Sequence, residues 1–206
     1  MTTTLSAPAR PAPGRLRTLW RAVHAPVAGV PAWAVRSAYL IQLAVLPSCV
    51  WRIAAVTFHV PLMNDTGASR EEMSGDLPWW FPMELYVIVL SLVTELFALA
   101  AYGMIARWGE VWPRWVPGLR GRRVPISFAA VTAALGALVL TVLWGWTVIT
   151  TVLGEQINGK PEAPDSPFYE FGWRYVVAFA SYLPLIAWGP LLAALTVAYV
   201  RRRRAH

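Results

Sequence analysis

The segment ELYVIVLSLVTELFALAAYGMI, residues 84–105, contains only two charged side chains, Glu84 and Glu95. About 20 predominantly apolar residues are enough for a helix to cross the hydrocarbon core of a bilayer. Three further apolar runs of this kind lie at about 37–60, 126–152 and 174–200. We therefore predict an all-α fold, an integral membrane bundle of four transmembrane helices.

The composition supports a membrane protein. Hydrophobic residues make up 57% of the 206 residues and charged residues 14%, whereas soluble domains are about 25% charged. The first apolar run is too long and too far from the start for a cleaved signal peptide, so we interpret it as a retained span. The single cysteine, Cys49, cannot form an intrachain disulfide, and no zinc or haem spacing occurs. We expect neither a metal nor a cofactor.

The charges alternate along the chain with the four apolar runs. Residues 1–36 and 106–125 carry five arginines each, and the chain ends with the arginine run 201–204. The intervening segments 61–82 and 153–172 carry one basic and four acidic residues each. Because basic residues in short loops stay cytoplasmic, we predict a plasma-membrane protein with both termini in the cytoplasm.

The chain divides into four regions by composition. We predict a disordered tail over 1–14, rich in Pro, Ala and Thr, and a juxtamembrane amphipathic helix within 15–33. The four-helix domain follows over 34–200, with a basic cytoplasmic tail over 201–206. We expect the basic segments to contact anionic lipid of the inner leaflet. No nucleic-acid partner is expected, because no nucleic-acid-reading module accompanies these segments.

Each of the first two predicted spans has one polar stripe. At 100° per residue, four polar residues of the second span fall within about a 40° arc: Glu84, Ser91, Glu95 and Tyr102. A broader arc of roughly 100° on the first span holds Gln42, Cys49, Arg52 and His59. We expect His59 to lie at the outer interface and Cys49 to be a small buried residue. All of these residues except Cys49 are candidates for a polar site inside the membrane.

An arginine inside a span costs from about 2.5 kcal/mol to more than 10 kcal/mol unless it is paired or reaches the interface. Counted from the outer ends of their spans, Arg52 lies about 12 Å deep and Glu95 about 16 Å deep. An arginine side chain can bridge that difference. We therefore predict a buried Arg52–Glu95 ion pair.

This predicted pair is compatible with several functions. It could fix helix register in a membrane-embedded accessory or interaction protein, or Glu95 could serve a small, oligomeric proton-coupled carrier or exporter. Alternatively, Glu95 could act as the acid of an enzyme that works on a lipid or terpenoid, although no second catalytic group is evident. No catalytic residue is assigned, because nucleotide-binding, zinc-protease and serine-hydrolase motifs are all missing from the sequence. A homo-oligomer or a membrane partner protein is expected.

The third and fourth runs contain signals for helix packing and bending. Ala129, Ala133 and Ala137 recur at four-residue spacing, which lets helix backbones approach closely. Pro184 and Pro190 should bend or loosen the fourth helix.

Four stretches resemble a group of uncharacterised four-span integral membrane proteins of high-GC actinomycetes: PSCVWRIA, LYVIVLSLVTELFALAAYG, RWGEVWPRWVPGLRGRRVP and LLAALTVAYVRRRR. The resemblance covers about residues 40–204, and the loop that begins at Arg107 is its most specific part. It implies the four-helix fold and a bacterial plasma membrane. It implies no activity and no catalytic residue.

Overall fold

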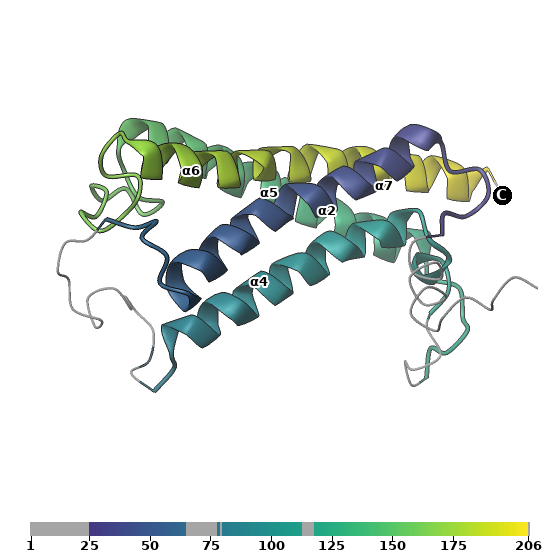
Figure 1. The fold of residues 1–206 in the computed structure, drawn as a ribbon. Helices are drawn as coiled ribbons and strands as arrows, with labels where there is room; N and C mark the ends of the chain where they lie inside the picture. Colours follow the sequence, from purple (N-terminus) through teal and green to yellow (C-terminus); the bar gives the residue numbers. More distant parts are fainter. Residues whose placement is uncertain (1–24, 65–77, 79, 113–117, 206) are drawn as a thin grey trace, which may run out of the picture.

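The computed structural model describes residues 25–64, 78, 80–112 and 118–205. The predicted tail 1–14 and residues 15–24 of the predicted juxtamembrane helix lie outside the described residues. The described chain is predominantly helical, and its long helices run side by side (Figure 1).

Four helical segments are long and apolar enough to cross a membrane: Ala32–Thr57, Met83–Met104, Ile126–Leu153 and Trp173–Arg204. The first consists of α2 (Ala32–Arg52) and a π-helical turn, η1 (Ile53–Thr57). The second consists of α4 (Met83–Ala100) and the 3-10 turn η2 (Ala101–Met104), and the third is α5 (Ile126–Leu153). The predicted all-α class and the four predicted spans are confirmed.

Proline sets the starts of three of these helices. Pro31, Pro82 and Pro125 directly precede α2, α4 and α5, each in an extended conformation. Proline disfavours a helical conformation at the residue before it, so a helix seldom extends past a proline toward the N-terminus. At the far end of α5, Gly154 takes a left-handed φ of 72°, and its N–H points to the last carbonyls of the helix.

The fourth span is interrupted where proline predicted a bend. Helix α6 (Trp173–Tyr182) passes into the 3-10 turn η4 (Leu183–Ala187), and α7 (Trp188–Arg204) follows. Pro184 lies in the first turn of η4, where its missing N–H costs little. Helix α7 continues through Arg204, so the arginines that we predicted to form a separate tail belong to the last turns of this helix.

The helices pack in the order α5, α7, α2, α4. Helix α5 lies along α7, α7 lies against α2, and α2 lies against α4. Helices α4 and α5 occupy the two edges of this row and do not pack along each other within the described residues, which leaves the helix set open between them (Figure 1). The buried core, which includes Ile41, Val45, Leu185 and Leu195, lies where α2 and α7 meet their neighbours.

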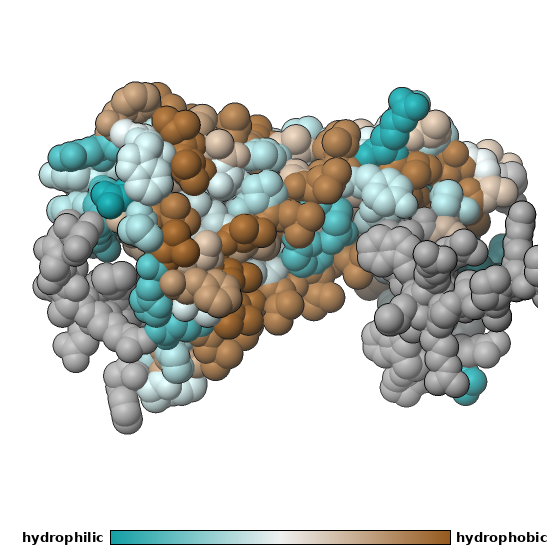
Figure 2. Space-filling model, viewed as in Figure 1, coloured by the Kyte–Doolittle hydropathy of each residue, from teal (hydrophilic) through white to brown (hydrophobic). Residues whose placement is uncertain are grey.

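Polar segments lie beyond the two ends of the helices, which we call the basic end and the acidic end. The basic end holds the loop after η2 and the arginines of α7, and there Val27 N–H donates to Ile105 O. The acidic end holds residues 58–64 and 154–172, joined by the Asn64 Nδ2 to Ser166 O hydrogen bond of 2.7 Å. Between the ends, large apolar side chains are exposed on all four spans (Figure 2).

Helices α5 and α7 approach each other closely at Gly189 of α7. A Cβ atom there would lie 2.6 Å from Thr141 N and 2.8 Å from Ala137 O, both on α5. Ala137, one of the small residues predicted to permit close packing, is indeed buried at this crossing. Backbone atoms cannot move aside as a flexible side chain can, so only glycine fits here.

We expect Gly189→Ala to lower the stability of the detergent-purified protein by about 1–3 kcal/mol, the usual cost of overpacking. Thermal melting measures the change. Gly145→Ala is the matched control, since a Cβ at Gly145 meets nothing within 4 Å. Equal melting of Gly189→Ala and the wild-type protein would contradict the close packing of α5 and α7.

Candidate functional site

The candidate site lies along the seam between α2 and α4. Gln42 Nε2 donates a 2.6 Å hydrogen bond to Glu95 Oε2. Ser91 lies about one turn of α4 from Glu95, toward the acidic end. There Cys49 Sγ donates weakly to Ser91 O at 3.7 Å. The two predicted polar stripes therefore do face each other, and the carboxylate of Glu95 is bonded to an uncharged carboxamide.

The predicted Arg52–Glu95 ion pair is wrong. The guanidinium of Arg52 turns instead toward its own helix and α6, where Nη2 lies 3.4 Å from Cys49 Sγ. The Cζ atom lies 5.9 Å from the ring centroid of Tyr182, in a cation–π arrangement. Tyr182 supplies part of the stabilisation that we had expected from a carboxylate.

The helix register explains why the pair does not form. Because Cys49 is opposite Ser91 and the helices are antiparallel, Arg52 is level with about Ile88. Glu95 is seven residues further along α4, or about 10 Å at 1.5 Å per residue. The depth comparison failed because it assumed that the outer ends of the two spans are level.

Several polar atoms along this seam are buried without a hydrogen-bond partner among the described residues. They are Gln42 Oε1, Arg52 Nε, Ser91 Oγ and Glu95 Oε1. Buried polar atoms are nearly always hydrogen-bonded in folded proteins. The seam therefore has unused capacity to donate and accept hydrogen bonds beside the Gln42–Glu95 contact.

The remaining predicted site residues are not gathered around Glu95. Glu84 lies in the first turn of α4, at the acidic end. Tyr102 is buried at the opposite end, and its ring packs edge to face on Tyr39 at 5.3 Å. His59 is exposed just beyond η1, with a left-handed φ of 52°. The polar stripe of α4 is therefore spread along the helix and does not form one compact site.

An ion pair that we did not predict joins the loop at the basic end to α7. Arg202 Nη2 lies 2.6 Å from Glu110 Oε1, and Arg203 Nη1 lies 3.8 Å from Glu110 Oε2. The signal was present in the sequence, because Glu110 is the only acidic residue between the second and third runs. An acid surrounded by arginines is expected to attract one of them.

Two cavities lie away from the seam. One, of about 650 Å³ at the acidic end, is bordered by Trp144, Phe168 and Tyr182 together with Glu155 and Glu162. The other, of about 660 Å³, is an apolar groove between α4 and α5. Among the described residues, no group of three His, Cys, Asp or Glu side chains is placed to hold a metal ion.

These features define the class as a multi-pass helical membrane protein. Comparison with protein-family models, with curated proteins and with solved structures finds no match to this chain. Function therefore has to be inferred from the geometry of its own residues.

The Gln42–Glu95 contact gives a test of coupling between α2 and α4. We expect Gln42→Leu and Glu95→Leu each to destabilise the protein by about 1–3 kcal/mol, because each leaves a buried polar partner unpaired. The double variant should recover much of that loss, since it leaves neither.

Thermal melting of the four forms in detergent measures this double-mutant cycle. Leu92→Ala on α4 serves as the control, because Leu92 is 61% exposed and its truncation should change little. Strictly additive losses in the double variant would contradict direct coupling of the two side chains.

Proposed function

We propose that this chain is a membrane-embedded accessory or interaction protein. In this proposal the Gln42–Glu95 contact holds α2 and α4 in register, and the protein acts by binding a partner within the bilayer. The proposal places the chain in the plasma membrane, with both termini in the cytoplasm and the arginines at the anionic inner leaflet. The contact of Glu95 with an uncharged side chain of the neighbouring helix favours a structural role for this carboxylate.

The observation that carries this proposal is the outer face of α5. Six residues at helical spacing form the α5 strip, which is defined as Val131, Ala134, Leu138, Val142, Gly145 and Ile149. They fall within about an 80° arc of the helix, away from its contact with α7. Val131, Leu138, Val142 and Ile149 are all more than half exposed. Small residues within such an apolar strip let a second helix approach closely.

We expect a complex that depends on the α5 strip when the protein is extracted with its native lipids. Ala134→Trp and Gly145→Trp place bulky side chains on the strip and should reduce the complex to monomer. Leu92→Trp, on the exposed face of α4, should leave it intact. Native gels of lipid-nanodisc extracts measure the size.

The same gels with the purified protein reconstituted alone distinguish the partner. A complex of unchanged size identifies a second copy, whereas a monomer identifies another membrane protein. A wild-type monomer in native extracts, or strip variants that retain the full complex, would contradict the proposal.

A proton-coupled carrier is the second candidate. It is favoured by the unpartnered buried atoms of Glu95, Gln42 and Ser91, which could pass a proton or a small polar solute along the seam. A carrier predicts that Glu95→Gln abolishes proton-coupled uptake in a protein that stays folded. A register role predicts unchanged uptake and an altered melting temperature. An enzyme is less well supported, because the only described hydrogen-bond partner of Glu95 is a carboxamide.

The orientation has a direct test in a Cys49→Ala background. A cysteine at Asn158, in the loop of the acidic end, should react with a membrane-impermeant maleimide on intact cells. A cysteine at Ala205, after α7, should react only once the cells are permeabilised. Labelling of Ala205→Cys on intact cells would reverse the proposed orientation.

A further inference from the structure

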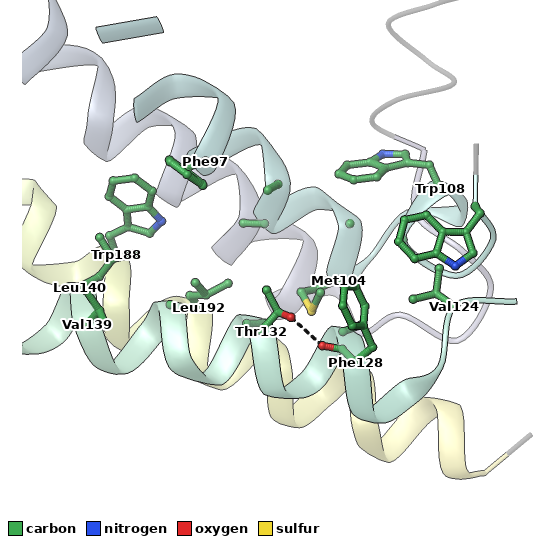
Figure 3. Close-up of a pocket in the computed structure, with 18 residues that line it drawn as sticks. Phe97, Met104, Trp108, Val124, Phe128, Thr132, Val139, Leu140, Trp188 and Leu192 are labelled. Atoms are coloured by element: carbon green, nitrogen blue, oxygen red, sulfur yellow. Dashed lines mark hydrogen bonds between the residues drawn. The ribbon is translucent and has the colours of Figure 1, made fainter. Parts of the chain in front are cut away.

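The groove between α4 and α5 is lined by side chains of three helices (Figure 3). Its two walls are α4 and α5, and α7 forms its floor. The principal lining side chains are Phe97, Met104, Thr132, Val139, Trp188 and Leu192. Small residues, among them Ala133 and Gly136, line the α5 wall, which explains why a hollow of about 660 Å³ remains there.

The groove is apolar and opens sideways. Among the described residues that line it, only Thr132 carries a hydroxyl group, and its Oγ1 already donates to Phe128 O at 2.8 Å. Because α4 and α5 do not pack along each other, the opening lies at the level of the exposed apolar side chains that face the bilayer. A molecule that enters this groove therefore comes from the hydrocarbon phase.

The length of the groove identifies the kind of occupant. On α5 its lining runs from Phe128 to Leu140, thirteen residues that span about 18 Å at 1.5 Å per residue. One leaflet of the hydrocarbon core is about 15 Å thick, half of the whole. A transmembrane helix of a partner would need a groove about twice as long. The length matches a single lipid chain.

Two arginines neighbour, in the chain, residues that line the basic end of the groove. Trp108 and Val124 line this end, and the residues next to them in the chain, Arg107 and Arg123, are exposed. Glu110, the only acid of this loop, is already bonded to arginines of α7. Within the described residues neither Arg107 nor Arg123 has an ion pair, so both are available to an anionic headgroup.

The deep end of the groove is closed by the Trp188 ring. This side chain is only 3% exposed, and its indole Nε1–H has no hydrogen-bond partner among the described residues. Trp188 lines the groove at the level of Leu140 and Val139, near the middle of α5 (Figure 3).

We propose that the groove binds one acyl chain of an anionic phospholipid from the leaflet at the basic end, with the headgroup at Arg107 and Arg123. The α5 strip lies on another face of α5, so this site does not depend on the accessory function proposed above. Bound lipid fills the opening between α4 and α5.

Native mass spectrometry of the delipidated full-length protein in detergent tests the site. The probes are palmitoyl-oleoyl phosphatidylglycerol and its zwitterionic phosphatidylcholine counterpart. We expect the wild-type protein to retain one phosphatidylglycerol in preference to phosphatidylcholine. Arg107→Gln with Arg123→Gln should reduce this preference roughly tenfold, because each arginine near a lipid headgroup contributes to binding.

Filling the groove separates this site from general lipid adhesion. Thr132→Trp and Val139→Trp each place an indole in the groove from an exposed position and should abolish tight binding of phosphatidylglycerol. Leu92→Trp, on the exposed face of α4 and outside both the groove and the α5 strip, is the matched control and should bind as the wild-type protein does.

The proposal is overturned if both groove variants retain phosphatidylglycerol as the wild-type protein does, or if the two lipids bind the wild-type protein equally. Equal loss of binding in Leu92→Trp would also overturn it. Loss of the native complex in α5 strip variants that still bind phosphatidylglycerol would leave the lipid site standing, so the two proposals can fail separately.

Discussion

The structure depends on the absence of water from the hydrocarbon core of a membrane. A peptide group left unpaired there costs several kcal/mol, so each crossing segment has to satisfy its backbone hydrogen bonds internally. The helical segments meet this requirement over most of their length, and irregular backbone is tolerated where protein surrounds it. The 3-10 turn η4 is an example, since Pro184 removes a donor within the fourth span while Leu185 beside it is fully buried by neighbouring helices.

The hydrocarbon core also makes burial of a polar side chain inside the spans unfavourable. Glu95 and Arg52 are stabilised there by different kinds of contact. Glu95 is bonded to Gln42 across the α2–α4 seam. Arg52 lies near the aromatic ring of Tyr182 and the sulfur of Cys49, without a carboxylate among the described residues. An anion is therefore not the only group that can lower the free-energy cost of a buried cation. A ring face and a polarisable sulfur also lower it in part.

Helix number and approximate span positions could be predicted because the bilayer imposes a length on each apolar run, and a bend in the fourth span could be predicted from Pro184. The 3-10 form of that bend and the continuity of α7 through Pro190 could not. The partner of Glu95 could not be predicted from depth. Gln42 and Arg52 lie on the same broad stripe of α2, and the choice between them depends on how α2 slides along α4. That register is set by packing, such as the edge-to-face contact of Tyr39 with Tyr102, which the apolar pattern does not encode.

The order of helix packing connects the seam to the groove. Within the row, α5 is held by close packing on α7 at Gly189, whereas the main body of α4 is held through α2 and η1. The position of α4 relative to α5 is therefore fixed indirectly, through α2. Since the Gln42–Glu95 hydrogen bond joins α4 to α2 near the middle of the membrane, it contributes to the width of the opening beside Phe97. A shift of α4 along this seam would change the walls of the groove while leaving the α5–α7 pair in place.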